Sequence, residues 1–201
     1  MGGKTISLKL SGLIPIMAQH GYFVPCESAE IGLSNYIRIL IGDSQSLERG
    51  LSSFGSEMEE LKEILNQAAD RSLILIDEIA SGTNPVEGLA LTRSIVDYMA
   101  EKPYIVLLTT HYEMVTNDRK IRNLQVKGLA DVNFRNLNSE LSLATTQRAR
   151  IDIIGNYMDY HLIEVDSEAQ VPKDAINIAN MLGLPDIIIE KANEYLMDEK
   201  E

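Results

Sequence analysis

The chain has 201 residues, 45% of them hydrophobic and 24% charged, which suits one domain of ordinary size with a substantial core and a small appendage. Its net charge of −12 argues against binding of duplex DNA by its own surface, because such binding relies on Lys and Arg contacts with phosphates. The apolar runs are too short to span a bilayer, no signal peptide is visible, and the single cysteine excludes an internal disulfide, so we expect a reducing, cytoplasmic setting without membrane contact.

The first half of the chain alternates helical and strand patterns. Helical spacing of apolar residues predicts helices over residues 4–20, 56–69 and 86–101. Short apolar runs predict strands over residues 22–24, 36–41, 73–76 and 104–108. Pro15 should bend the first helix or end it early, Gly21 should stop it, and residues 50–55 read as a loop. Strands that alternate with helices in this way predict an α/β fold, in which helices cover a parallel sheet.

Beyond residue 120 the pattern changes. Strands of a more antiparallel kind are predicted over residues 131–134, 140–144 and 160–165, and residues 138–156 read as irregular. Two helices are predicted over residues 173–182 and 186–197, around the turn Gly183-Leu184-Pro185.

Gly2-Gly3-Lys4-Thr5 stands immediately before the first predicted helix. A phosphate-binding loop needs glycines so that backbone N–H groups can point at phosphates, a Lys for the outer phosphates, and a Ser or Thr hydroxyl for Mg²⁺. It must also open a helix, whose N-terminal N–H groups face the phosphates. The full motif is G-x-x-x-x-G-K followed by Ser or Thr, and only its last positions are present. By itself, the segment fits a flexible, glycine-containing terminus equally well.

Asp77 and Glu78 follow the apolar run at residues 73–76. In phosphate-loop ATPases an Asp at a strand end holds the Mg²⁺ shell. A neighbouring Glu is the natural general base for a hydrolytic water. The alternative is that both carboxylates simply begin a solvated loop. Their combination with the upstream Gly-Gly-Lys-Thr segment favours a nucleotide site.

Two further segments are candidates for the same site. His111 follows the next buried strand, on the ligand edge of a parallel sheet, where it could bond the γ-phosphate or the attacking water. A lone His more often caps or packs, but its place one strand beyond Asp77 and Glu78 favours the functional role. Ser52, Ser53 and Phe54 precede the second helix and form either a phosphate-binding helix start or an ordinary serine N-cap.

In this order, the motifs resemble those of the ATPase domain of the MutS family, which belongs to the ABC class of P-loop ATPases. Met1–Thr5 matches the end of the family's phosphate loop, G-P-N-M-G-G-K-S/T, and Ser52-x-Phe54-x-x-Glu57-Met58 matches its signature segment. Asp77–Thr83 matches the Walker B and D-loop region, and Thr110-His111-Tyr112 matches the segment with the switch histidine. Ala175–Leu196 resembles the start of the C-terminal helix-turn-helix. The residues before Leu51 are closer to the second MutS subfamily, or to a stand-alone MutS-like group, than to mismatch-repair MutS.

The resemblance implies a P-loop ATPase domain over residues 1–170 that lacks its first strand and the start of its phosphate loop. Residues 171–201 would begin a helix-turn-helix dimerisation segment. The implied cofactors are ATP and Mg²⁺. The implied site residues are Gly2, Gly3, Lys4 and Thr5 for the nucleotide, Thr5 and Asp77 for Mg²⁺, Glu78 as the general base and His111 as the γ-phosphate sensor. In a homodimer, the partner subunit's site would be completed by Ser52, Ser53, Phe54, Ser81, Gly82, Thr83 and Asn84.

The function implied by the resemblance is ATP hydrolysis that couples a conformational change of the dimer to DNA mismatch repair or recombination control. DNA would be contacted by domains absent from this chain. Two alternatives remain open. With its phosphate loop incomplete, the chain would be a catalytically weak dimerisation and scaffold module that binds ATP poorly. It would otherwise be a MutS-like ATPase that serves a non-DNA partner such as a metabolic enzyme.

Overall fold

The computed structural model describes residues 4–41, 53–112, 115, 120–129, 131–165 and 175–198. Apart from its first two residues, the chain divides into two compact units, which we call unit 1 (residues 3–122) and unit 2 (residues 123–201). The boundary expected at residues 170 and 171 falls inside unit 2, outside the described residues. Within the described ranges, no helix has the length and apolar character needed to cross a membrane.

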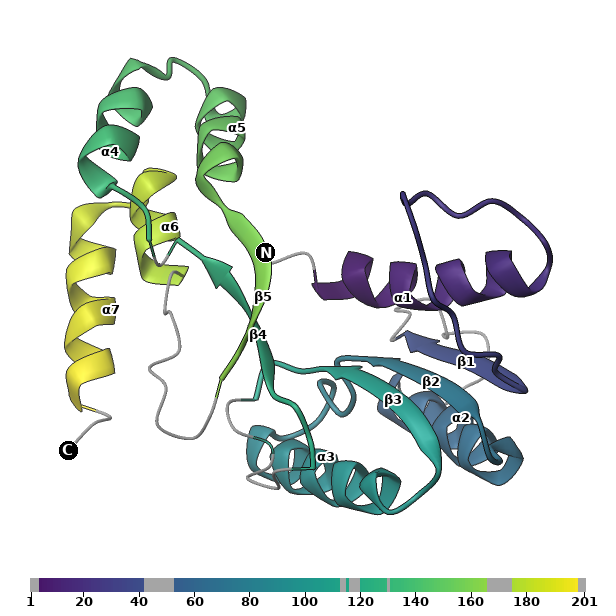
Figure 1. The fold of residues 1–201 in the computed structure, drawn as a ribbon. Helices are drawn as coiled ribbons and strands as arrows, with labels where there is room; N and C mark the ends of the chain where they lie inside the picture. The colour runs from purple at the N-terminus through teal and green to yellow at the C-terminus, as the bar shows by residue number, and fades with distance from the viewer. Residues whose placement is uncertain are drawn as a thin grey trace. The chain divides into compact units, whose positions relative to one another are not determined.

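Unit 1 is an α/β structure, as predicted (Figure 1). Its helices are α1 (Lys4–Gln19), α2 (Ser53–Gln67) and α3 (Pro85–Ala100), and its strands are β1 (Tyr36–Ile41), β2 (Ser72–Asp77) and β3 (Tyr104–Thr109). The three strands form a parallel sheet in the order β1-β2-β3. Both crossovers step in the same direction, and because such connections are right-handed, α2 and α3 lie on one face of the sheet. Helix α1 covers the opposite face (Figure 1).

Successive side chains of β2 point to opposite faces of the sheet, and each set packs against a different layer of helices. Ile74 and Ile76 belong to the core shared with α2 and α3. Leu73 and Leu75 pack with Leu8 of α1 on the other face. Because β2 is covered on both sides, all its residues are buried, which explains why residues 73–76 are apolar without alternation.

Gly12 sets how closely α1 approaches the sheet. A Cβ atom at this position would overlap Leu75 Cδ1 and lie 2.9 Å from Ile39 Cδ1. Helix α1 continues through Pro15 to Gln19, so the alternative that Pro15 ends it early was wrong. Its packing against the sheet offsets the local cost of proline, which is about 3 kcal/mol in a helix interior. Gly21, at φ +77°, takes the left-handed conformation beyond the helix end, as the predicted stop required.

Two other predictions for unit 1 differ from the structure. Residues 22–24 form no strand, and Tyr22 and Phe23 are exposed. A strand needs a neighbour to satisfy its backbone, and an apolar run of three residues does not supply one. Helix α2 already begins at Ser53, inside the predicted loop 50–55, of which residues 50–52 lie outside the described part.

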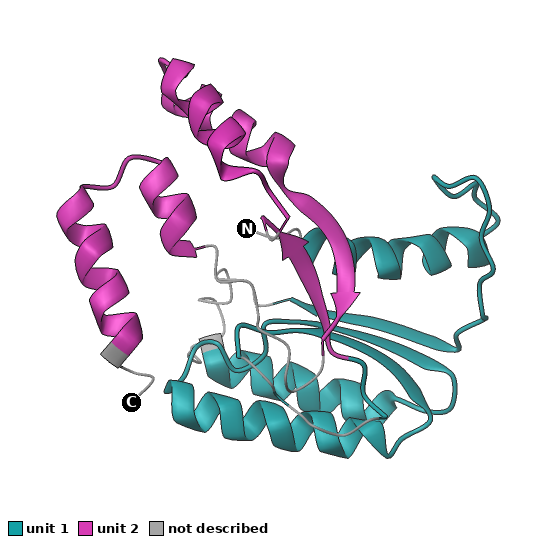
Figure 2. Cartoon of the chain, turned by 60° about the vertical axis from the view of Figure 1, so that its left-hand side comes forward, with its two compact units in different colours: residues 1, 3–122 teal, residues 2, 123–201 magenta. Residues whose placement is uncertain are grey.

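Unit 2 combines an antiparallel pair of strands with two helical pairs (Figure 2). Its elements are β4 (Leu124–Gly128), α4 (Phe134–Leu143), α5 (Gln147–Tyr157), β5 (Asp159–Glu164), α6 (Ala175–Met181) and α7 (Asp186–Asp198). Strand β4 pairs with β5, and the α4–α5 pair is inserted between them along the chain. Leu137, Leu141 and Ile154 form the core of this insertion.

The prediction for residues 131–156 was wrong. The expected strands at 131–134 and 140–144 and the irregular segment at 138–156 are replaced by α4 and α5. Asn133 accepts hydrogen bonds from the N–H groups of Arg135 and Asn136, and Thr146 accepts one from Ala149 N–H, so both helices have side-chain caps. Leu137 and Leu141, four residues apart, carried the helical signal that was missed. Strand β4 was missed as well.

The remaining predictions for unit 2 are confirmed within a few residues. Strand β5 corresponds to the predicted strand at 160–165, and α6 and α7 to the two C-terminal helices. Gly183 in the turn between them has φ +89°, a conformation that favours glycine.

Strands β4 and β5 are joined by a charged cluster as well as by backbone pairing. Lys127 Nζ lies 2.7 Å from Asp131 Oδ2 and 3.2 Å from Asp159 Oδ2. His161 donates its backbone N–H to Asp159 and places its ring beside the same carboxylate. The backbone and ring of His161, followed by Lys127, lower the pKa of Asp159 to about 2. These contacts favour the ionised form of Asp159 and connect β4 to β5 through side chains.

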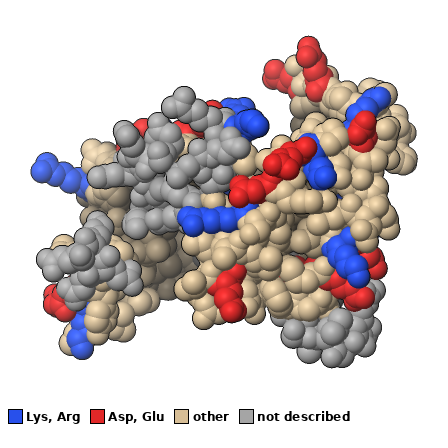
Figure 3. All heavy atoms as spheres, turned by 90° about the horizontal axis from the view of Figure 1, so that it is seen from below, with Lys and Arg blue, Asp and Glu red and all other residues tan. Residues whose placement is uncertain are grey.

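Charge is mixed on the face of the molecule that Figure 3 draws. On the face drawn in Figure 3, Lys and Arg side chains lie among Asp and Glu side chains, and the described residues there form no broad basic patch. This distribution agrees with the acidic composition.

The close approach at Gly12 can be tested with alanine. Gly12→Ala should destabilise unit 1, because a Cβ that overlaps the buried Leu75 should cost toward the upper end of the about 1–3 kcal/mol typical of overpacking, whereas Ala gains only roughly 1 kcal/mol over Gly in a helix. Gly155 in α5 is the matched control, because no atom other than those of its chain neighbours and its own helix backbone lies within 4 Å of a Cβ there. Gly155→Ala should be neutral or stabilising, as measured by urea unfolding followed by circular dichroism. Equal stability of the two variants would contradict the close packing.

Candidate functional site

The site forms at the carboxyl edge of the parallel sheet, where β2 and β3 end side by side. The register of the two strands places Asp77 opposite Thr109. Thr109 Oγ1 donates a hydrogen bond of 2.5 Å to Asp77 Oδ1. The Asp77 side chain is almost fully buried, yet it lies at the edge where parallel sheets bind ligands. The threonine therefore holds a buried carboxylate in a fixed orientation at this edge.

Glu78 and His111 form a direct contact beside Asp77. Glu78 N–H donates to both the carbonyl oxygen of Thr109, at 3.0 Å, and its hydroxyl, at 3.1 Å. Glu78 has φ +56°, a strained conformation that costs about 1–3 kcal/mol and that must be held by its surroundings. Its Oε1 lies 2.7 Å from His111 Nε2, and His111 is largely exposed. The residues predicted as base and γ-phosphate sensor are therefore adjacent.

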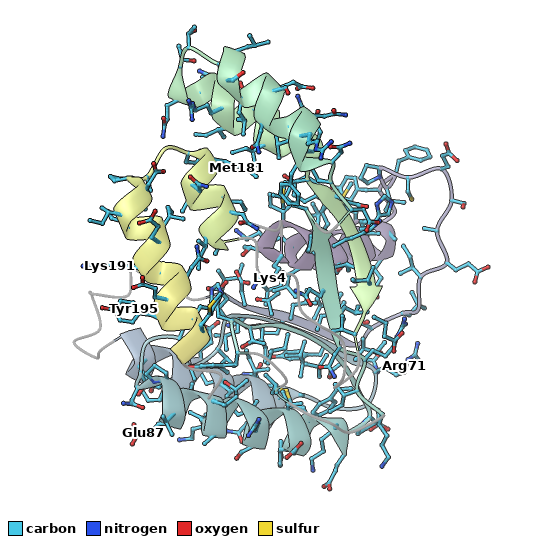
Figure 4. All side chains as sticks on the ribbon, turned by 90° about the vertical axis from the view of Figure 1, so that its left-hand side faces the viewer. Lys4, Arg71, Glu87, Met181, Lys191 and Tyr195 are labelled. Atoms are coloured by element: carbon cyan, nitrogen blue, oxygen red, sulfur yellow. The ribbon has the colours of Figure 1, made fainter. Side chains whose placement is uncertain are left out.

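Lys4 lies at the same edge, although it is far from β3 in the sequence. Its Nζ donates a 3.1 Å hydrogen bond to the carbonyl oxygen of Thr110, the residue after β3. Lys4 lies near the carboxyl ends of the strands, whereas Arg71, which precedes β2, lies at their amino ends (Figure 4). The N-terminus of α1 is thus placed at the carboxyl edge, with Thr5 in its first turn. Gly2 and Gly3 lie outside the described residues.

The other predicted residues lie around this edge or outside the described part. Ser81 and Gly82 are exposed in the turn that follows Ala80, with Thr83 next to them. Asn84 caps α3, because its Oδ1 accepts the N–H of Val86 at 2.9 Å. Phe54 packs against the core of unit 1, where it anchors the start of α2. Ser52 and the side chain of Ser53 lie outside the described residues.

Two residues to which the sequence analysis gave no role meet at the backbone of Ala80. Glu57 Oε2 accepts the N–H of Ala80 at 3.1 Å, and Tyr112 Oη donates to the carbonyl oxygen of Ala80 at 3.3 Å. Burial raises the pKa of Glu57, and the hydrogen bond from Ala80 partly opposes this effect. Both residues belong to matched motifs, but nothing in their spacing shows that they meet at one peptide group.

The donors at this edge suit a hard cation shared with a phosphate. Mg²⁺ is bound in phosphate sites by one or two carboxylates together with phosphate oxygens and water. Asp77 offers a carboxylate and Thr5 a hydroxyl at the start of α1. Among the described residues, no group of three or more His, Cys, Asp or Glu could hold a metal ion by itself.

The sequence of the chain is similar to that of a known protein family. The family of MutS domain V matches residues 1–199 of the chain. The chain is 35% identical over 201 residues to Endonuclease MutS2 of Fusobacterium nucleatum, covering 100% of this chain and 23% of that protein. It is 35% identical over 202 residues to Endonuclease MutS2 of Lactobacillus acidophilus, covering 98% of this chain and 22% of that protein.

A third relative, Endonuclease MutS2 of Latilactobacillus sakei, is 36% identical over 203 residues, covering 100% of this chain and 23% of that protein. The chain thus spans less than a quarter of the length of these three relatives. Because the family match extends over residues 1–199, almost the whole sequence, the chain belongs to the family of MutS domain V, the ATPase domain of MutS proteins.

Proposed function

We propose that the chain binds ATP together with Mg²⁺ and hydrolyses it at the carboxyl edge of the β1-β2-β3 sheet. The contact between Glu78 and His111, beside the buried carboxylate of Asp77, is the observation that carries this proposal. Membership of the MutS domain V family supports it. The hydrogen bond from Lys4 to Thr110 adds a cation and a helix N-terminus at the same edge.

Each residue has a distinct task in this proposal. Lys4 contacts the outer phosphates, and the N-terminal N–H groups of α1 face the same anion. Thr5 and Asp77 hold Mg²⁺, which neutralises charge on the phosphate oxygens when it is bound. The hydrogen bond from Thr109 keeps Asp77 oriented for this role. Lys4 and Thr5 of α1 and Asp77 at the end of β2 would therefore hold the phosphates and the metal ion from two elements.

Glu78 acts as the general base in this proposal. A base must lie within hydrogen-bond reach of the water whose proton it removes. Glu78 is partly exposed at the edge and is held there by Thr109 and His111. The carboxylate accepts the proton of the attacking water, and His111 orients either the carboxylate or the γ-phosphate. Asp77, which is buried and bonded to Thr109, is less suited to meet a mobile water.

We further propose that the site is completed in a homodimer by Ser52, Ser53 and Phe54 together with the loop from Ser81 to Asn84. The exposure of Ser81 and Gly82 supports this part of the proposal. Because the Phe54 side chain packs into the core of unit 1 of its own subunit, Phe54 would contribute to the partner's site by fixing the start of α2. Hydrolysis would then depend on dimerisation.

The output of ATP hydrolysis would reach DNA through parts of the protein outside this chain. The relatives are named endonucleases, and this chain covers less than a quarter of their length, so their nuclease activity is not placed on these residues. The acidic composition and the mixed surface charge favour an indirect role in DNA repair or recombination.

The role of Asp77 can be tested through its dependence on magnesium. Outer-shell partners of metal ligands already contribute roughly 10- to 100-fold to metal affinity, so loss of the ligand charge in Asp77→Asn should weaken Mg²⁺-ATP binding at least about tenfold. ATP binding in EDTA should change much less. Binding is measured by calorimetry in the full-length protein, with Asp97→Asn, an exposed position on α3, as the control. Equal losses with and without Mg²⁺ would exclude Asp77 as the metal ligand.

Glu78→Gln should separate binding from turnover. The amide keeps the size of the side chain but cannot accept the proton, so kcat should fall by roughly 10²–10⁴-fold while the affinity for ATP is retained. The measurement is phosphate release by the full-length protein, compared with equilibrium binding of ATP. Unchanged turnover in Glu78→Gln would show that another group is the base.

The contribution of one subunit to the site of the other can be tested by mixing. Lys4→Ala removes the phosphate contact and Ser52→Ala the signature hydroxyl, so each homodimer should be inactive. A mixed dimer would contain one site in which both halves are intact, and ATPase activity should partly return. Mixed dimers without any recovery of activity, at every mixing ratio, would count against the trans assignment.

A further inference from the structure

The turn after β2 is strained at two residues. Glu78 has φ +56° and Ala80 has φ +59°, and neither is glycine. Such conformations persist only where the surroundings hold them. Thr109 holds the first of the two through two hydrogen bonds from Glu78 N–H. The question is what holds the second.

Ala80 is held by side chains from two other elements. Its side chain is fully buried, and Glu57 of α2 accepts its N–H at 3.1 Å. Tyr112, in the loop after β3, donates its hydroxyl to the carbonyl oxygen of Ala80 at 3.3 Å. Both polar groups of a buried residue are thus satisfied by side chains that precede and follow the turn in the sequence.

The space around this peptide group is also restricted. A Cβ atom at Gly88 of α3 would lie 2.8 Å from the carbonyl oxygen of Ala80 and would overlap the hydroxyl of Tyr112. Helix α3 therefore approaches the Ala80 carbonyl without a side chain between them. The turn is confined by α2, α3 and the loop after β3 together.

We propose that Glu57 is a positioning residue: its bond to Ala80 N–H holds the Glu78–Ala80 turn so that the Glu78 carboxylate stays beside His111. This inference rests on the proposed ATPase function, because Glu78 is the base in that function. It also assigns a connection between α2 and the catalytic edge. Glu57 lies in the first turns of α2, so a movement of this end of the helix is transmitted to Ala80 and, two residues earlier, to Glu78.

Substitutions of Glu57 separate its acceptor from its charge. Glu57→Ala removes the carboxylate oxygen that accepts the buried N–H of Ala80. Because misplacement of a catalytic group by about 1 Å can cost roughly a hundredfold in rate, we expect kcat to fall roughly ten- to a hundredfold while the KM for ATP changes little. Glu57→Gln keeps an amide oxygen at the same place, and we expect it to restore most of the lost turnover.

Two further variants test the same contact: a control on α2, and a substitution of the residue that bonds the Ala80 carbonyl. Glu59→Ala removes an exposed carboxylate from α2 and should leave kcat unchanged. Tyr112→Phe removes only the hydroxyl that bonds the Ala80 carbonyl, and should lower kcat in the same direction as Glu57→Ala. The kcat of both variants is measured in the full-length protein, below the melting temperature of every variant.

A second measurement does not depend on turnover. Amide hydrogen exchange of the segment from Glu78 to Ser81 should be slow in the wild type and at least about tenfold faster in Glu57→Ala, while Glu57→Gln keeps most of the protection. A merely structural role would lower the melting temperature of Glu57→Ala without changing kcat for the folded protein. That result, or unchanged exchange, would overturn the proposal. A wild type without ATPase activity would instead overturn the proposed function, and the exchange result would still decide whether Glu57 holds the turn.

Discussion

The candidate site depends on one threonine at the end of β3. Thr109 donates its hydroxyl hydrogen to Asp77, and its hydroxyl and carbonyl oxygens accept the N–H of Glu78. These bonds exist because parallel pairing brings the last residues of β2 and β3 into register. A buried carboxylate without such a partner would be unfavourable at the end of an apolar strand. Thr109 therefore makes this pair of adjacent carboxylates compatible with a buried strand.

The two helical layers place the remaining groups around this pair. On one face, α1 lies close to the sheet at Gly12 and brings Lys4 to the carbonyl of Thr110. On the other face, α2 and α3 share a core with Ile74 and Ile76. The same packing places Glu57 and Tyr112 against the turn after β2. The polar site is thus supported by apolar contacts on both faces of one buried strand.

The sequence predicted most of the α/β unit because its signals are local. The uninterrupted apolar run of β2, followed at once by Asp77 and Glu78, identified both a buried strand and a candidate site. The same approach failed for residues 131–156, where strands and an irregular segment were predicted, whereas Leu137 and Leu141 lie on one face of helix α4. At Pro15 only one of the two alternatives, an early end of the helix, was wrong, because α1 continues to Gln19 and packing against the sheet offsets the local cost of proline.

The sequence by itself determined the residue types of the site: a Lys and a Thr opening a helix, two carboxylates ending a strand, and a His after the next strand. The order of these motifs was enough to identify the MutS family. Only the tertiary structure decided that Glu78 contacts His111, that Lys4 reaches Thr110, and that Glu57 and Tyr112 meet at Ala80. The physical reason is that motif spacing records distance along the chain, whereas these contacts depend on strand register and on how closely each helix packs against the sheet.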